Sequence, residues 1–429
     1  SLAGALSAPL LLALTFANGI GLAMRWPVFA AIVPQIVSRD HLPLALALNG
    51  IAMNISRVIG PALAGGLLAA ISPAAVFVLN VLLAGVAFWL ILRWRNAPKE
   101  SPLPGERFVG AMRVGLAFAM QSPRLKVVLL RIFLFFLQIT ALVALLPLVA
   151  RELHGGGPGT FTVMLSCVGA GAIVAALYFP RWRARYGRDR FVVAGTLVHA
   201  ALSSAIVLIP EVWFAIPAMI IVGMAWISVA NSLTVAAQTF LPDWVRARGM
   251  SIYQMALMGG SAAGSLLWGQ VAGLSNVRTA VIAAAVFGPL ALLATRKVSV
   301  EGGGDEDLTP AQPANLPELA VQVEPDEGPV MVTVEYLIAP DDVPEFNRLM
   351  EITRRARLRQ GALSWALLRD TTVPGRYVEY FLDENWVEHL RRHERFTAAD
   401  NELRGRRLAL HRGDGPPKVK RYVAEGRLD

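Results

Sequence analysis

The stretch "KVVLLRIFLFFLQITALVALLPLVA" (126–150) is apolar over almost its whole length and decides the fold class. An α-helix rises 1.5 Å per residue, so about 20 apolar residues cross a hydrocarbon core of roughly 30 Å. A globular domain with many runs of this length would have almost no polar surface, and the sequence contains nine of them. They cover residues 8–37, 43–70, 73–92, 126–150, 160–180, 191–209, 212–240, 247–273 and 277–295.

The composition agrees with a membrane protein and divides the chain in two. Of the 429 residues, 55% are hydrophobic and only 17% are charged, which is unusual for a soluble protein. The apolar part ends near residue 295, and the segment 296–429 is rich in Asp, Glu and Arg. The first residue is Ser and no basic segment precedes the first apolar run. We therefore expect no signal peptide and a chain that starts partway through a longer protein.

Basic residues gather in alternate loops. The loop "FPRWRARYGRDRF" (179–191) holds five arginines, the 93–126 segment is also basic, and "LPDWVRARG" (241–249) adds two more. The connections on the other side carry one Arg each or no basic residue at all. This asymmetry predicts a protein of the cell (inner) membrane whose basic loops lie in the cytoplasm. Anionic lipid headgroups explain the basic clusters better than nucleic acid does, so the expected partner is the lipid bilayer and not nucleic acid.

A weak internal repeat indicates two related halves. "AAIVPQIVSRD" (30–40) and "LTVAAQTFLPD" (233–243) align Gln35 with Gln238, and each precedes a helix crowded with small residues. The basic 93–126 segment leaves three spans before it and six after it. Parallel repeats of about six helices are the plan of one large class of secondary transporters, from which three helices would then be absent.

These motifs resemble the major facilitator superfamily, in the branch of bacterial drug exporters and the enterobactin exporter. "SRVIGPALAGG" (56–66) resembles its antiporter motif, "RARYGRD" (183–189) its loop motif, and "TFANGIGLA" (15–23) its fourth-helix motif. The resemblance covers about residues 1–297 and implies that nine of twelve helices are present, starting with helix four. It implies a secondary transporter that exports a small amphipathic molecule, siderophore or drug, by alternating access and without a cofactor.

Proton coupling stays open. Thr15 stands where the family often has an arginine tied to coupling, and we find no Asp or Glu in the middle of any span. A coupling carboxylate would then lie outside this sequence, or coupling would work in another way.

The resemblance and the polar residues inside spans give two sets of candidate residues. Polar groups within a membrane are costly and tend to face a cavity or a partner, although each is also explained by interhelical hydrogen bonds or, for Arg25, by an ion pair. Small residues let helices approach closely, which serves a gate or simple packing equally well. The predicted substrate pathway comprises Asn18, Arg25, Gln35, Gln138, Asn231, Gln238 and Gln254. The predicted gating or packing set comprises Asn54, Arg57, Gly60, Pro61, Gly65, Arg185, Gly187 and Arg188.

The C-terminal region has the pattern of a small α+β domain. Residues 301–329 are acidic and rich in Pro and Gly, as in a flexible linker. The alternation and helical periodicity that follow predict the order βαββαβ of a ferredoxin-like domain over 329–427. This stretch resembles antibiotic-biosynthesis-monooxygenase-like domains, which pair through their sheets and so imply a homodimer. Trp365, Trp386, His389 and His393 leave an oxygenase open, but "EHLRRH" (388–393) is no zinc motif, so we predict a regulatory or dimerising module and no metal.

The predicted fold is therefore an all-α polytopic membrane protein of major facilitator type with a C-terminal α+β ferredoxin-like domain. Its expected segments are the end of the N-terminal transmembrane half (1–95), a basic cytoplasmic linker (96–125), the C-terminal half (126–297), an acidic linker (298–328) and a cytoplasmic βαββαβ domain (329–427). The predicted function is export of a small molecule. The alternative is a membrane-tethered, cofactor-independent monooxygenase carried by the C-terminal domain.

Overall fold

A computed structural model of the chain describes residues 9–10, 12–21, single positions between 37 and 71, 73–94, 103–157, 159–183, 185–296, 307–311, 321 and 323–425. The chain divides into two compact units. One, here called the bundle unit, comprises Ser1–Lys99, Val128–Ala236 and Tyr253–Glu301. The other, here called the tail unit, comprises Glu100–Val127, Ala237–Ile252 and Gly302–Asp429. The tail unit thus combines the C-terminal region with two segments from earlier in the chain.

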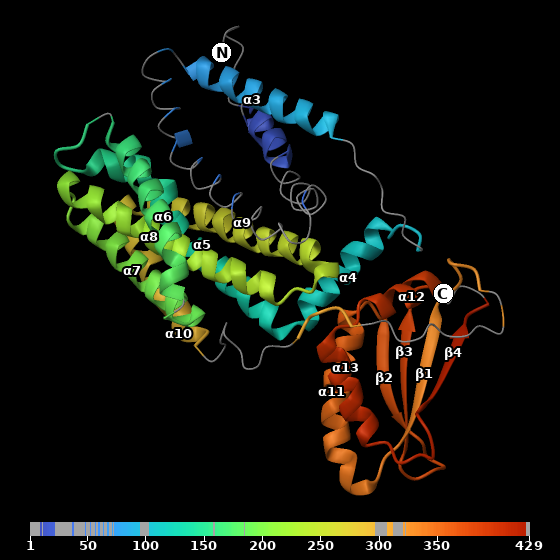
Figure 1. Ribbon diagram of the computed structural model, residues 1–429. Coiled ribbons are helices and arrows are strands. Elements are labelled where there is room, and N and C mark those ends of the chain that lie inside the picture. The colour runs from blue at the N-terminus through green and yellow to red at the C-terminus, as the bar shows by residue number, and fades with distance from the viewer. Residues whose placement is uncertain are drawn as a thin grey trace. The chain divides into compact units, whose positions relative to one another are not determined.

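The long helices follow the predicted spans to within a few residues at each end. Predicted spans 8–37 and 43–70 lie mostly outside the described residues, although Leu12–Gly21 is helical. The helices are α3 (Pro73–Arg93), α5 (Pro123–Glu152), α6 (Thr160–Arg183), α7 (Arg188–Leu208), α8 (Val212–Thr239), α9 (Asp243–Leu274) and α10 (Val277–Ala294), labelled in Figure 1.

Five helices in the described part of the chain are long and apolar enough to cross a membrane, namely α3, α5, α7, α8 and α10. The helices α6 and α9 also occupy predicted spans. Of α6, Thr160–Ala175 is the stretch that can be compared, and it is apolar but shorter than a span, whereas α9 is long but less apolar. In α9 the reason is its composition, since it begins with charged residues and carries several serines and glutamines. On α3 the apolar side chains are exposed, for example Leu82 at 62% and Leu92 at 66%, as expected for a helix whose solvent is lipid.

The core of the bundle unit lies where five helices meet. Leu146 of α5, Met164 of α6, Ile206 of α7, Met219 of α8 and Val281 of α10 belong to one buried cluster. Glycines bring the backbones close at the crossings, because a Cβ at Gly171 of α6 would collide with the backbone of Ile220 in α8. A small residue therefore stands where these two helices cross.

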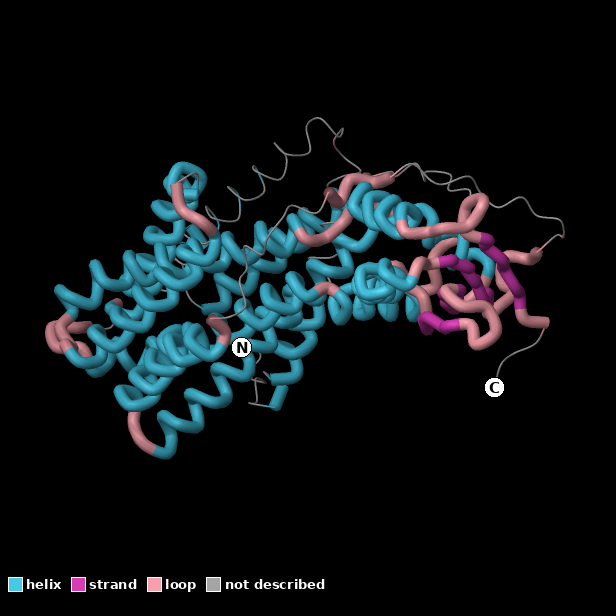
Figure 2. The backbone as a smooth tube through the Cα atoms, turned by 90° about the horizontal axis from the view of Figure 1, so that it is seen from below, coloured by secondary structure: helices cyan, strands magenta, loops and turns pink. Residues whose placement is uncertain are grey.

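The tail unit contains all the β-strands in the described residues, and Figure 2 shows them grouped at the C-terminal end of the chain. Its elements are α4 (Phe108–Gln121), β1 (Val330–Leu337), η2 (Pro340–Asp342), α11 (Val343–Arg359), β2 (Ser364–Arg369), β3 (Arg376–Asp383), α12 (Trp386–Glu394), α13 (Ala398–Ala409) and β4 (Lys418–Val423). The antiparallel sheet has the order β2-β3-β1-β4, with Val332 of β1 opposite Phe381 of β3 and Arg421 of β4. This is the strand order of the ferredoxin-like plan.

One predicted element differs. The sequence pattern predicts a single helix after β3, whereas the structure has two, α12 and α13. The break is caused by Thr397, whose side chain accepts from the Asp400 backbone N–H while Asp400 accepts from the Thr397 backbone N–H. This capping box starts a new helix. By contrast, the predicted helix end near Gly361 is confirmed, because α11 ends at Arg359 and Gly361 has a φ of +114° that favours glycine.

The two faces of the sheet differ in burial. One face packs against the helices through Val332, Tyr336 and Phe381, which are nearly fully buried together with Phe346 of α11. On the other face Leu368 is 52% exposed and Tyr422 is 47% exposed. Alternation along each strand thus gives one buried and one open, partly apolar face.

Candidate functional site

The clearest polar site of the bundle unit is at Gln138. This residue lies at the midpoint of the 30-residue α5 and is only 2% exposed. Neither its side-chain oxygen nor its nitrogen has a hydrogen-bond partner among the described residues. Gly288 of α10 makes room for the amide, since a Cβ at that position would overlap it. A buried amide without partners is unusual, because the great majority of such groups are hydrogen-bonded to protein or water.

A small cavity lies beside this residue. It has a volume of about 10 Å³ and is lined by Gln138, Arg131, Thr196 of α7 and Gly288, among others, which is room for about one water molecule. Arg131 lies two turns before Gln138 on the same side of α5 and donates to the carbonyl oxygen of Thr295 at 3.1 Å. Two helices, α5 and α7, therefore bring a guanidinium, an amide and a hydroxyl to one place.

The other predicted pathway residues do not gather at this cavity. Asn18 is exposed, Asn231 and Gln254 are half-buried, and Gln238 is exposed one residue before the end of α8. Arg25 and Gln35 lie outside the described residues. His199 of α7, which the sequence left as a satisfied polar group, is buried with its Nδ1 3.2 Å from the hydroxyl of Ser203.

The gating set is placed only in part. Asn54, Arg57, Pro61 and Gly65 lie outside the described residues. A Cβ at Gly60 would meet no described atom within 4 Å. Gly187 is the N-cap of α7 with a φ of −68°, Arg185 is exposed, and Arg188 is the half-buried first residue of α7. The loop motif therefore forms a helix start, and the backbone there does not itself require glycine.

The small-residue helix of the second repeat shows close packing directly. A Cβ at Gly264 of α9 would lie 2.6 Å from the carbonyl oxygen of Leu137 in α5, and one at Gly260 would overlap the Phe133 backbone. The indole N–H of Trp268 donates to the same Leu137 carbonyl at 2.7 Å. The glycines thus hold α9 against α5 directly beside Gln138, with no room for a side chain at the crossing.

In the tail unit, a buried carboxylate organises the core between sheet and helices. Glu379 of β3 has no exposed surface and accepts from Arg357 and Trp365 at 3.0 Å each. Tyr336 donates to it at 3.1 Å and Arg407 at 3.4 Å. Burial alone would raise the pKa of Glu379, but the charges of Arg357 and Arg407 outweigh it and hold the pKa at about 2. Burial and the neighbouring carboxylate raise the pKa of Tyr336 to about 12.

His389 and His393, which kept an oxygenase possible in the sequence analysis, make structural contacts. His389 is fully buried, with Nδ1 2.8 Å from Asp383 and Nε2 accepting from Arg421 at 3.2 Å. Its second nitrogen is therefore not available as a base. Burial lowers the pKa of His389, and it lowers the pKa of His393 to about 4. Trp365 donates to Glu379, so these residues form a satisfied core.

The C-terminal domain forms ion pairs with α4 and with Glu106, which precedes α4. Arg395, only 3% exposed at its side chain, donates to Glu106 at 2.7 Å and to Glu388 at 2.9 Å. Glu106 also pairs with Arg248, and Arg113 of α4 pairs with Glu384. The sequence assigns these loop arginines to lipid headgroups, whereas the structure gives several of them carboxylate partners within the protein. Sequence reasoning missed Glu106. The signal available in the sequence was the presence of this acid within a basic segment.

Comparison with known proteins identifies the chain. A family model described as "Transmembrane secretion effector" matches residues 1–428. The chain belongs to this family of major facilitator transporters. The match includes the sheet of the tail unit as well as the helices, so both units of the transporter are part of the family pattern.

Two solved structures resemble the transporter. The Escherichia coli fucose:proton symporter is 16% identical with a TM-score of 0.44, over 65% of this chain and 73% of that chain. A bacterial homologue of the human lysosomal transporter Spinster, inward-facing and unoccupied, is 16% identical with a TM-score of 0.40, over 62% of this chain and 73% of that chain. No curated protein gives a match. At these scores the two structures add nothing to the family assignment.

Proposed function

We propose that this secondary transporter exports a small amphipathic molecule, of the siderophore or drug type, across the inner membrane by alternating access. The observation that carries the proposal is the amide of Gln138, buried at the middle of α5 with both polar atoms unpartnered in the described residues. A polar side chain at the centre of a membrane helix is costly unless it meets a partner. A substrate that passes along α5 would supply that partner.

The substrate chemistry follows from the surroundings of Gln138. The amide can donate and accept, Arg131 and Thr196 line the same small cavity, and the remaining lining is apolar, as at Leu134 and Phe135. Such a setting suits a molecule with an apolar body and a few hydrogen-bonding or anionic groups. The family description, a secretion effector, supports the outward direction.

We propose that the C-terminal domain lies in the cytoplasm and acts as a regulatory or dimerising module. The alternative of a membrane-tethered monooxygenase is not favoured, since the family is one of transporters. The contacts of His389 also argue against it, because Asp383 and Arg421 occupy both ring nitrogens.

Efflux from energised cells tests the proposal. Cells that express the full-length transporter are preloaded with a panel of siderophores and fluorescent amphipathic dyes, and the initial efflux rate is measured. We expect Gln138→Ala to lower the rate of an exported compound about 10-fold, the worth of one or two buried hydrogen bonds. Gln238→Ala removes the same side chain from an exposed position at the end of α8 and should leave efflux unchanged.

Two results would contradict the proposal in different ways. If the wild-type transporter retains every compound as vector controls do, export is rejected. If it exports a compound and Gln138→Ala exports it equally fast, the assignment of Gln138 to the pathway is rejected.

A further inference from the structure

Helix α4 is apolar on all sides, although it lies in a basic segment of the chain. Of its 14 residues, "FVGAMRVGLAFAMQ", Arg113 carries the one charge and Gln121 is the one other polar side chain. A helix that is apolar all round is normally buried, either in a protein core or in a membrane. In the tail unit, however, α4 is buried on one side and exposed on another.

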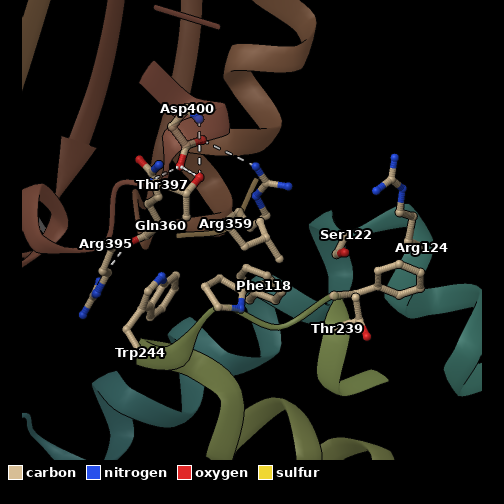
Figure 3. A pocket seen from close by; sticks show the side chains of 13 residues that line it. Phe118, Ser122, Arg124, Thr239, Trp244, Arg359, Gln360, Arg395, Thr397 and Asp400 are labelled. Carbon is tan, nitrogen blue, oxygen red and sulfur yellow. Dashed lines mark hydrogen bonds and ion pairs between the residues drawn. The ribbon is translucent and has the colours of Figure 1, made fainter. Parts of the chain in front are cut away.

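The buried side packs within the tail unit. Its buried residues are Val114, Gly115, Phe118 and Ala119. The helix contacts α11 of the C-terminal domain, and Figure 3 shows Phe118 beside Trp244 and Arg359. The rings of Phe118 and Trp244 meet edge to face with centroids 5.7 Å apart, and the Arg359 guanidinium lies 5.9 Å from the Phe118 ring. This packing determines which side of α4 stays exposed.

Five large apolar side chains form a continuous exposed surface on that side, here called the α4 stripe. They are Phe108, Val109, Met112, Leu116 and Met120, with exposed fractions from 55% at Met120 to 76% at Phe108. At 3.6 residues per turn they fall within an arc of about 120°. Arg113 lies at the edge of this arc and pairs with Glu384, so the stripe itself is uncharged. A contiguous apolar surface of this kind marks an interaction site.

The place of α4 in the chain indicates that lipid covers the stripe. The helix ends at Gln121, and α5, which is long and apolar enough to cross a membrane, begins at Pro123. A single residue therefore joins the stripe to a membrane span. Lys126 is exposed in the first turn of α5, where basic side chains reach lipid headgroups. With 14 residues, α4 is too short to cross the bilayer itself, since a span needs about 20 residues.

We propose that α4 is an interfacial helix whose stripe inserts into the bilayer leaflet at which α5 begins. Helices of this kind lie in the plane of the interface and bury their apolar side about 5–10 Å deep. Because the other side of α4 packs against the C-terminal domain, the helix also holds that domain at the membrane surface. The domain cannot leave the bilayer without withdrawing the five apolar side chains from lipid. This inference does not depend on what the transporter exports.

Spin labelling of the chain tests the proposal, because the sequence contains a single cysteine, Cys167. In a Cys167→Ala background, a nitroxide is attached at Met112→Cys or at Leu116→Cys, and the control label is at Glu402→Cys, an exposed position of α13. The protein is reconstituted in vesicles of phosphatidylcholine and phosphatidylglycerol. Electron paramagnetic resonance then measures collisions of each label with oxygen, which concentrates in lipid, and with a polar nickel chelate, which stays in water.

We expect the nickel chelate to collide with the two α4 labels about 10-fold less often than with the control label, because a polar solute is excluded from hydrocarbon. Oxygen should collide with the α4 labels more often than with the control. Labels on α4 that are as accessible to nickel as the control would place the stripe in water. Labels protected from both reagents would show that protein covers the stripe. Either result overturns the proposal.

A matched pair of variants tests whether the stripe itself holds α4 in lipid. With the label at Met112, Leu116→Glu places a charge one turn away on the stripe and should raise the nickel collision rate about 10-fold, since a charge in hydrocarbon is costly. Leu408→Glu changes a leucine of α13 that is 39% exposed and should leave that rate unchanged. Equal effects of the two variants would contradict the proposal. Transport is not measured, so failure of the export proposal leaves this test intact.

Discussion

Replacing Glu379 by Gln should destabilise the C-terminal domain strongly. The change removes one negative charge from a site with no exposed surface, where Arg357 and Arg407 are its counter-ions. Gln can still accept from Arg357 and Trp365, but its NH₂ group must then face the donors of Tyr336 and Arg407. The two buried guanidinium groups would then share a neutral partner. Removing one charge of a buried ion pair is strongly destabilising, because the remaining charge stays buried without compensation.

The size of the effect follows from the pKa of Glu379. Its pKa falls from 4.5 to about 2 on folding, which corresponds to about 3 kcal/mol in the free energy of unfolding. Since the folded pKa is the lower one, this contribution is fully present above about pH 4.5 and is lost as the pH falls toward 2. We therefore expect wild type and Glu379→Gln to differ by about 3 kcal/mol at pH 7 and to converge below pH 4.5.

Hydrogen exchange of the full-length transporter measures this directly. About 3 kcal/mol corresponds to a roughly 150-fold faster exchange of the β1 and β3 amides through opening of the domain. The matched control is Glu335→Gln in β1, on the opposite face of the sheet, where the carboxylate pairs with Lys420 at 3.3 Å near the surface. An exposed pair of this kind contributes at most about 1 kcal/mol. If both variants exchange alike, the buried network does not stabilise the domain as argued.

Further predictions concern the helix crossing, the helix cap and the open sheet face. Gly264→Leu should separate α9 from α5 and lower the midpoint of thermal unfolding in detergent, at a cost of about 1–3 kcal/mol. The control is Gly269→Leu, which should be neutral, because a Cβ at Gly269 would meet no described atom within 4 Å. Thr397→Ala should cost about 1 kcal/mol by loss of the capping box, seen as faster exchange limited to the first turn of α13; unchanged exchange there would contradict the capping argument. We expect a second copy of the domain to cover the open sheet face, where Leu368 is 52% exposed. Leu368→Asp should therefore abolish a crosslinked dimer. Crosslinking that persists in this variant would argue against that face.

Among the described residues, the sequence determined the long apolar helices and the succession of strands in the C-terminal domain. Runs such as 126–150 are too apolar and too long for an aqueous surface, so their solvent is lipid. In lipid the backbone must satisfy its own hydrogen bonds, and length and apolarity are therefore sufficient to predict helices. In the tail, period-two alternation marks the strands of a half-buried sheet. The break before α13, which the sequence pattern did not predict, depends on the short-range contact of Thr397 with Asp400, and periodicity does not report such a contact.

Only the tertiary structure decided which polar residues meet. Seven residues are equivalent pathway candidates by sequence, yet of the described ones Gln138 alone lies nearly fully buried with both polar atoms unpartnered there, because Gly288 of α10 leaves it space. Likewise, the arginines of the loops were expected at lipid, but Glu106 and Glu384 take Arg248 and Arg113. Hydropathy is a property of consecutive residues, so it can be evaluated from the local sequence. Ion pairs and cavities instead depend on side chains that can be hundreds of residues apart. That is why the fold could be predicted and the sites could not.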